Sequence, residues 1–192
     1  MSALLITLGY LCGSVPFGVI VARVLTGKDV RTAGSGNIGA TNVARVAGKK
    51  IGALVLLLDA GKGAVPVMLA RQLSPEQPLL HVAVGLAAFL GHVFPVWLRF
   101  KGGKGVATAL GVLIVLLPWS ALIGFVVWGV ILAAFRVSSI GSLIGGLCAI
   151  VAGFFQGAPI EYPALGVTLL LAMIYTHRSN LQRMRQGREN RV

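Results

Sequence analysis

The sequence predicts an all-α integral membrane protein with about seven transmembrane helices, an outside N-terminus and a cytoplasmic C-terminus. Of its 192 residues, 56% are hydrophobic and only 11% are charged, which is too apolar for a soluble domain that must cover itself with polar groups. The apolar residues recur in stretches near the roughly 20 residues that a membrane-spanning helix needs. The cations gather in the connections between these stretches.

Seven apolar stretches are candidate spans. They cover residues 2–25, 51–70, 79–100, 105–117, 119–135, 138–155 and 162–176. The fourth is short for a span, and only Pro118 separates it from the fifth, so five or six spans remain as alternatives on length alone. Within the first stretch, Ser14-Val15-Pro16 predicts a kink. Several spans are rich in glycine, which favours close helix packing in lipid.

The distribution of cations predicts the orientation of these spans. With the N-terminus outside, the outward connections hold only Arg71, together with Glu76 and Glu161. The inward connections hold Lys28, Arg31, Arg45, Lys49, Lys50, Arg99, Lys101, Lys104, Arg136, Arg178, Arg183, Arg185, Arg188 and Arg191. This asymmetry follows the positive-inside rule and favours an odd number of spans. It also explains the net charge of +12 better than nucleic-acid binding does, because the cations do not cover a soluble surface.

We therefore expect one transmembrane helical domain over residues 1–192, with cytoplasmic motif loops near 26–50, 99–108 and 177–192. The first span lacks a basic leader and exceeds a signal core in length, so we expect the cell to retain it. Cys12 and Cys148 lie inside spans without ligand or redox spacing, which indicates small packing residues.

The first motif loop, residues 34–42, reads GSGNIGATN and is followed by Arg45. Glycines let successive backbone N–H groups form one concavity, and a helix starting after them adds the positive end of its dipole. The loop matches the dinucleotide fingerprint G-x-G-x-x-G, but no strand precedes it and the next acid, Asp59, lies in an apolar span. The pattern indicates an anion site; a flexible surface loop is the alternative.

The second motif loop, residues 99–105, places Lys101 and Lys104 around a double glycine where the fourth apolar stretch begins. Backbone donors, a helix dipole and ammonium groups can together bind one phosphate. A tight turn whose lysines only set the topology is the alternative. His92, at the end of the preceding span, is interpreted as a packing residue rather than a catalyst.

The third motif segment begins with His177 and Asn180, which share a face if the last span continues as a helix. A histidine with a pKa of about 6.5 could exchange protons or donate to an oxyanion, although a basic tail is ordinarily a topology signal.

Asp59 and Lys62, at i and i+3 in the second span, are expected to pair. Charge inside a membrane indicates function, but a structural pair is equally open.

Together these stretches resemble the bacterial acyl-phosphate:glycerol-3-phosphate acyltransferase family. The resemblance covers residues 13–18, 35–45, 59–63 and 91–108, and then His177, Arg178, Asn180 and Glu189. It implies transfer of a fatty acyl group from acyl phosphate to the 1-hydroxyl of glycerol 3-phosphate, giving lysophosphatidic acid and phosphate in phospholipid biosynthesis.

The resemblance also implies the roles of individual residues. The catalytic set is Ser35, Arg45, Lys104 and His177, of which the first three hold the phosphate of glycerol 3-phosphate. Residues that bind the substrates are Gly36, Asn37, Ile38, Gly39, Thr41, Asn42, Gly103 and Asn180. The first loop would bind the acyl-phosphate head, while His177 and Asn180 complete the acceptor pocket.

The resemblance implies no metal and no cofactor. The expected partners are glycerol 3-phosphate, long-chain acyl phosphate and membrane lipids, with no nucleic acid and no obligatory protein partner. The expected location is the bacterial inner membrane, with the active site facing the cytoplasm. A membrane transporter for a phosphorylated or anionic solute is the main alternative, and it predicts anion sites near the bilayer midplane.

The acceptor of the hydroxyl proton stays open at this point. Many glycerolipid acyltransferases use a His-x4-Asp pair, but Leu86, Trp97 and Gln182 stand five residues after the three histidines. Either His177 is the base, or the oxygens of the acyl phosphate accept the proton as phosphate leaves.

Overall fold

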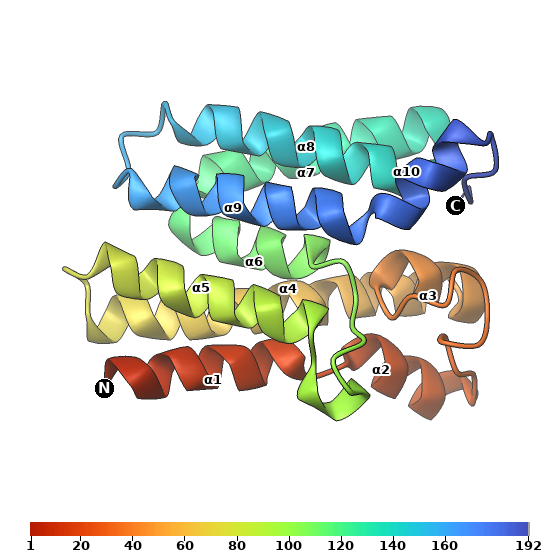
Figure 1. The fold of residues 1–192 in the computed structure, drawn as a ribbon, viewed down its shortest axis with the longest axis horizontal. Helices are drawn as coiled ribbons and strands as arrows, with labels where there is room; N and C mark the ends of the chain where they lie inside the picture. The colour runs from red at the N-terminus through yellow and green to blue at the C-terminus, as the bar shows by residue number, and fades with distance from the viewer. Residues whose placement is uncertain (192) are drawn as a thin grey trace.

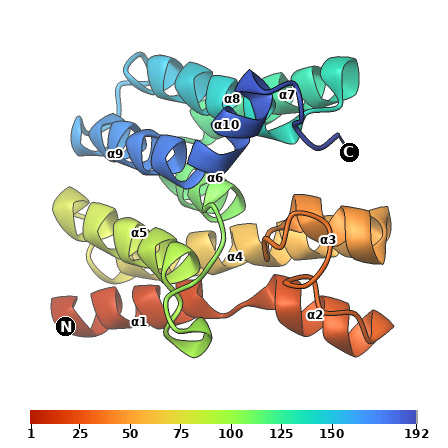
Figure 2. The same cartoon turned by 45° about the vertical axis from the view of Figure 1, so that its right-hand side comes forward.

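The computed structural model describes residues 1–191, and in this part of the chain every regular element is a helix. In order these are α1 (Ser2–Ser14), α2 (Phe17–Thr26), α3 (Ala40–Ala47), α4 (Lys49–Leu73), α5 (Pro78–Val93), the 3₁₀ turn η1 (Val96–Leu98), α6 (Val106–Leu116), α7 (Pro118–Phe135), α8 (Ser138–Gly153), α9 (Glu161–Thr176) and α10 (Arg178–Arg185). The long helices lie side by side, with the two ends of the chain at opposite ends of the bundle (Figure 1). α6 lies between a group of α1, α4 and α5 and a group of α7, α8 and α9 (Figures 1 and 2).

Helix lengths confirm the membrane class but not every expected span. Among the described residues, four segments are long and apolar enough to cross a membrane, namely Ser2–Thr26, Lys49–Leu73, Pro78–Leu98 and Pro118–Phe135. Three further apolar helices are shorter, namely Val106–Leu116, Ser138–Gly153 and Glu161–Thr176. The 11 residues of α6 rise about 16 Å, roughly half the hydrocarbon core of a bilayer. The stretch 105–117 is therefore too short to be a full span by its own length.

The kink expected at Ser14-Val15-Pro16 is a complete interruption of the first span. α1 ends at Ser14, Val15 is extended, and α2 begins at Phe17. Proline has no backbone N–H and disfavours helical geometry in the residue before it. The break leaves the Val15 carbonyl without a helical partner, and Lys62 Nζ donates to it at 2.7 Å.

Glycine permits the closest helix contacts, as expected from the glycine-rich spans. A Cβ added at Gly111 of α6 would lie 1.8 Å from the Ala60 carbonyl oxygen of α4. A Cβ added at Gly145 of α8 would lie 2.5 Å from the Gly124 carbonyl oxygen of α7. Only a residue without a side chain fits where backbones approach this closely.

The last helix does not continue through His177, contrary to expectation. α9 ends at Thr176 and α10 begins at Arg178. The Met173 carbonyl accepts from the His177 backbone N–H at 3.0 Å and also from its Nδ1 at 2.7 Å. His177 itself has φ of −92° and ψ of 4°, which is outside helical geometry, so the helix is interrupted at this residue.

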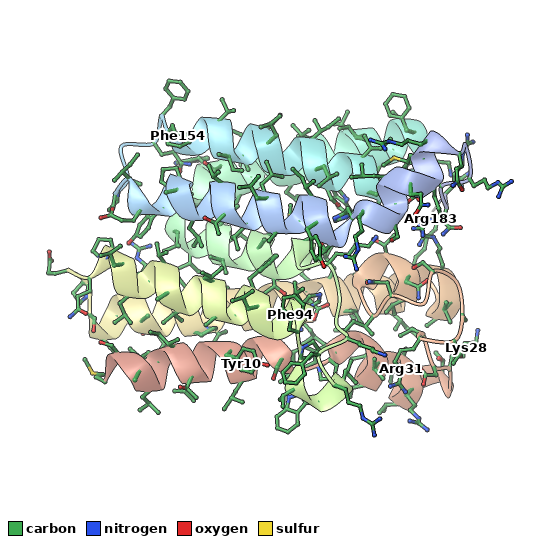
Figure 3. All side chains as sticks on the ribbon, viewed as in Figure 1. Tyr10, Lys28, Arg31, Phe94, Phe154 and Arg183 are labelled. Carbon is green, nitrogen blue, oxygen red and sulfur yellow. The ribbon has the colours of Figure 1, made fainter. Side chains whose placement is uncertain are left out.

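Side chains in Figure 3 show which end of the bundle carries the cations. Lys28 and Arg183 lie at the end near the C-terminus, whereas Phe154 lies at the other end (Figure 3). Tyr10 of α1 donates through its hydroxyl to the Phe94 carbonyl at 2.8 Å, which ties the first helix to the end of α5 (Figure 3). The three motif segments approach one another at the basic end.

Candidate active site

One cavity of about 1140 Å³, including its open mouth, brings the three motif segments together. Its polar side chains are Ser35, Asn37, Thr41, Asn42, Arg45, Asp59, His92, Lys104, Ser138, Ser139, Ser142, His177, Asn180 and Glu189. Its apolar part is formed by Leu110, Leu113, Ala121, Phe125, Trp128, Ala149 and Met173, among others. The cavity therefore joins a cationic, polar region to an apolar region between α6, α7, α8 and α9.

The side chain of Asn42 holds the first motif loop in shape. Its Nδ2 donates to the carbonyls of Val30, Ala33 and Asn37 at 2.9, 3.2 and 2.9 Å, and its Oδ1 accepts from the Ser35 N–H at 2.8 Å. Asn42 is only 2% exposed, so no water replaces these bonds. The Asn42 amide therefore bonds to the backbone of the loop region, and it affects a ligand by fixing the shape of the loop.

A helix begins within the first motif loop, after its last glycine, as expected for an anion site. Gly39 is the N-cap of α3, and Gly39, Ala40 and Thr41 line the cavity. The first N–H groups of a helix have no partner within it, and the helix dipole is positive at this end. Thr41 Oγ1 is hydrogen-bonded to Ser138 Oγ of α8 at 3.1 Å, which connects the loop to the far wall.

Arg45, on α3, is held by the C-terminal tail. Its Nε donates to the Arg191 carbonyl at 3.1 Å and its Nη2 donates to the Asn190 carbonyl at 3.2 Å. Burial lowers the pKa of Arg45, but a guanidinium keeps its charge in proteins. To bind an anion, Arg45 must exchange these two carbonyl oxygens for oxygens of the ligand.

Lys104 is the cation of the second loop that reaches the cavity, whereas Lys101 is exposed. The expectation that both lysines act on one phosphate is therefore wrong for Lys101. Lys104 Nζ donates to Asn180 Oδ1 at 2.5 Å. Burial lowers the pKa of Lys104 to about 8; the charge of Glu189 opposes this effect, and nearby arginines add to it.

Glu189 fixes the orientation of Asn180. Its carboxylate accepts hydrogen bonds from Ser139 Oγ at 2.9 Å, from Arg183 Nε at 3.1 Å and from Asn180 Nδ2. Burial acts to raise the pKa of Glu189, but these donors outweigh burial and hold the pKa below its usual value. The carboxylate stays ionised, so the Asn180 amide turns its oxygen toward Lys104.

His177 is a neutral hydrogen-bond acceptor in this geometry. Its Nδ1 is 2.7 Å from the Met173 carbonyl oxygen, which can only accept, so Nδ1 carries the proton. Burial, aided by the charge of Lys104, lowers the pKa of His177 to about 4. The neutral ring then has a lone pair on Nε2, and this tautomer cannot donate from Nε2 to an oxyanion.

Most residues expected at the site line the cavity, and three do not. Those that do are Ser35, Asn37, Gly39, Thr41, Asn42, Arg45, Lys104, His177 and Asn180. Ile38 is instead part of an apolar cluster with α2, because its side chain turns away from the cavity. Gly36 lies at a turn with φ of +70°, and Gly103 is covered by the ring of His92.

Three serines of α8 form a wall of the cavity that sequence reasoning did not identify. Ser138, Ser139 and Ser142 are buried and line it. Ser138 Oγ also accepts from Trp128 Nε1 of α7 at 3.2 Å. The available signal was their spacing at i, i+1 and i+4 in an apolar helix, which places hydroxyls on one face.

Known proteins resemble this chain over its whole length. The family model described as glycerol-3-phosphate acyltransferase matches residues 3–187. The glycerol-3-phosphate acyltransferase of Myxococcus xanthus (strain DK1622) is 56% identical over 191 residues, covering 100% of both chains. That of Anaeromyxobacter dehalogenans (strain 2CP-C) is 52% identical over 198 residues, covering 100% of this chain and 98% of the relative. The glycerol 3-phosphate form of PlsY, an integral membrane glycerol 3-phosphate acyltransferase, superposes with a TM-score of 0.94 at 41% identity, covering 100% of this chain and 95% of the other.

Proposed function

The chain belongs to the glycerol-3-phosphate acyltransferase family, and we propose that its cavity binds glycerol 3-phosphate and acyl phosphate side by side. The protein is an integral membrane acyltransferase of phospholipid synthesis. The observation that supports the two-substrate site most strongly is the cavity itself, which joins Arg45, Lys104 and the start of α3 to an apolar region. A phosphorylated, water-soluble acceptor fits the polar part, and a donor with a long chain needs both parts.

The acceptor binds at the cations in this proposal. Lys104 and Arg45 neutralise the phosphate of glycerol 3-phosphate, and Ser35 adds a hydroxyl donor. Asn180 holds Lys104 in place through its Oδ1. His177 accepts a hydrogen bond from the glycerol moiety through Nε2. Two cations suit a dianionic phosphate because charge-assisted hydrogen bonds are about twice as strong as neutral ones.

The phosphate of the donor binds at the first loop and the N-terminus of α3. Ala40 and Thr41 present backbone N–H groups there, while the Gly39 N–H donates to Asn37 Oδ1 at 2.9 Å, and anions bind favourably at such helix starts. Gly36, Ile38 and Gly103 contribute through the shape of the two loops rather than by contact. The acyl chain lies along the apolar wall of α6, α7 and α8, with the membrane lipids as its source.

The reaction is a direct acyl transfer between two bound anions. The 1-hydroxyl oxygen of glycerol 3-phosphate attacks the acyl carbonyl carbon, and the bond from that carbon to the phosphate oxygen breaks. An ester forms and inorganic phosphate leaves. A pKa of about 4 makes His177 a weak base, so an oxygen of the donor phosphate accepts the hydroxyl proton. Acyl phosphate is already activated, and alignment supplies most of the catalysis without a metal or cofactor.

The test is acyl transfer by the purified protein in detergent, with phosphate release as readout. Acyl phosphate plus glycerol 3-phosphate is expected to yield lysophosphatidic acid and phosphate, and acyl-coenzyme A is expected to be inactive as donor. Phosphate release that does not need glycerol 3-phosphate would contradict the proposal. If folded protein gave no product with either donor, uptake of an anion by proteoliposomes would test the transporter alternative.

The chain is further proposed to cross the inner membrane seven times as one domain, with α6 as a short crossing enclosed between the other helices (Figures 1 and 2), with the motif segments on the cytoplasmic side and with no obligatory protein partner. The termini lie at opposite ends of the bundle (Figure 1), and the cations gather near the C-terminus, as the positive-inside rule requires. In a variant lacking Cys12 and Cys148, an impermeant thiol reagent added to intact cells should label Glu76→Cys and spare Gln186→Cys. The reverse pattern would contradict this orientation.

A bulky side chain in the apolar part of the cavity is expected to shorten the acyl chains that the enzyme accepts. Leu110→Trp should lower kcat/KM for a long-chain acyl phosphate about tenfold more than for a short-chain one, because each displaced methylene costs the donor hydrophobic binding energy. Leu57→Trp is the matched control, since Leu57 is exposed on α4. Equal losses of kcat/KM with both donors would show that the acyl chain does not lie beside Leu110.

Replacement of His177 is expected to change the rate but not the pH dependence near neutrality. His177→Ala should lower kcat/KM about tenfold by removing an acceptor for the substrate. Because the pKa of His177 is about 4, its ring stays neutral throughout an assay from pH 5.5 to 8. The profile of the variant should therefore match wild type in shape. An acidic limb between pH 6 and 7 that disappears in His177→Ala would identify the histidine as the base.

A further inference from the structure

A group of buried ionisable side chains lies beside the cavity and outside the set of residues assigned to the substrates. This α4–α5 charge cluster consists of Asp59, Lys62 and His92, which are 1%, 4% and 3% exposed. Lys62 Nζ lies 2.8 Å from Asp59 Oδ1, which confirms the pairing expected from their spacing, and His92 Nδ1 lies 3.7 Å from the same oxygen. Asp59 and His92 line the cavity. Charges at this depth are costly, which makes them candidates for a function.

One arm of the cluster reaches the break in the first span. The Lys62 ammonium donates to the Val15 carbonyl, which also accepts from the Phe17 N–H at 3.1 Å where the break at Pro16 turns the chain. α2 begins directly after the break, and there a Cβ at Gly18 would lie 1.8 Å from the Ile38 carbonyl oxygen of the first loop. The position of the break is therefore transmitted by direct backbone contact to the loop that precedes α3.

The other arm reaches the second loop. The Gly103 N–H donates to the His92 carbonyl at 3.1 Å. The imidazole lies directly on Gly103, since a Cβ there would be 2.2 Å from His92 Nε2. Lys104 is the next residue along the chain. Within the described residues His92 Nδ1 has no hydrogen-bond partner, and it lies 3.7 Å from the Asp59 carboxylate.

We propose that the α4–α5 charge cluster is a positioning site for acyl transfer, which sets the first loop through the α1–α2 break and Lys104 through Gly103. The inference rests on the proposed function of the cavity. Buried ion pairs often stabilise a fold no better than apolar residues of similar size, so stability alone does not account for this one. A displacement of about 1 Å at a substrate-binding group is enough to cost large factors in rate.

The test replaces the ion pair as a whole, because Lys62→Met alone would leave the Asp59 carboxylate buried and unpaired. Asp59→Leu/Lys62→Met is expected to keep a thermal transition close to wild type, to raise KM for glycerol 3-phosphate about tenfold and to lower kcat. A purely structural role would reduce the active fraction, and with it the apparent kcat, while leaving KM unchanged. A folded double variant with wild-type KM would overturn the proposal.

A matched control is the hydrogen-bonded pair of His81 and Tyr162, which is also buried and has an Nδ1 to hydroxyl distance of 2.7 Å. It does not line the cavity, so His81→Leu/Tyr162→Phe should leave KM unchanged whatever it does to stability. His92→Asn serves if the first double variant does not fold. It keeps a polar group near Asp59 and removes the ring from Gly103, so an unchanged KM would also overturn the proposal.

A conservative variant and a site variant complete the experiment. Lys62→Arg keeps the charge and the donor to Val15, and its KM should stay within about threefold of wild type. Lys104→Met, measured in parallel, tests the substrate site by itself. A raised KM in Lys104→Met with a wild-type KM in the cluster variant would reject the positioning role alone, whereas an unchanged KM in Lys104→Met would reject the assigned site.

Discussion

Lys104→Met is expected to lower kcat/KM for glycerol 3-phosphate by about 10²- to 10³-fold. Losing the charged partner of a buried anion typically costs about 2–5 kcal/mol, and about 1.4 kcal/mol corresponds to a factor of ten. Methionine has nearly the length of lysine and keeps the packing while removing the ammonium. The loss should be measured with acyl phosphate at saturation and glycerol 3-phosphate varied.

The same residue predicts an alkaline limb in the pH profile. Because burial lowers the pKa of Lys104 to about 8, its positive charge is present below that pH and is lost as the pH rises through it. Binding of a phosphate needs the charge, so kcat/KM should fall above about pH 8. Lys104→Arg should be slower but should lack this limb, since arginine stays protonated.

Lys101→Met is the control for both measurements. Lys101 lies in the same loop but is exposed and outside the cavity, so its loss should change kcat/KM by less than about threefold. Equal effects of the two methionine variants would indicate a general electrostatic attraction rather than a specific site. If the alkaline limb persists unchanged in Lys104→Arg, the group that titrates there is not Lys104.

Asn42→Leu is expected to abolish at least about 99% of the activity while the helical bundle remains folded. The substitution keeps the branching at Cγ but leaves the carbonyls of Val30 and Asn37 and the Ser35 N–H without their partner. Each unsatisfied buried group costs about 1–3 kcal/mol, which the loop can avoid only by opening. An open loop no longer presents the start of α3 to a phosphate.

Limited trypsin digestion measures this opening directly. Cleavage after Arg31, which precedes the loop and is exposed, should become faster in Asn42→Leu, whereas the thermal transition of the bundle should change little. Thr32→Ala is the control, because its hydroxyl donates only to the Asp29 carbonyl in a neighbouring turn. If Asn42→Leu had wild-type activity and were digested at the wild-type rate, Asn42 would not be the residue that holds the loop in shape.

The features that could be predicted depend on local spacing. The break at Pro16 follows from the chemistry of one residue, and the Asp59–Lys62 pair follows from helical periodicity. The helix starts at the two glycine-rich loops are likewise local: α6 begins at Val106, as expected, and α3 begins at Ala40, two residues before the expected end of the first loop. Spacing also predicted a helix that continues past His177, and this was wrong because His177 departs from helical geometry, with φ of −92° and ψ of 4°.

The sequence by itself therefore determined the membrane class, the gathering of cations at one end and the family to which the chain belongs. These depend on composition and on patterns within a few tens of residues. Only the tertiary structure decided which groups share the cavity. Lys104 and Asn180 are 76 residues apart in sequence, and Thr41 and Ser138 are 97 apart.

Burial was also decided by the tertiary structure alone. It excluded Lys101 from the site, made His177 a neutral acceptor and lowered the pKa of Lys104 to about 8. The physical reason is that desolvation depends on all atoms packed around a group. Neighbours along the chain supply few of those atoms, so local sequence determines where helices begin and end but not which charges water can reach.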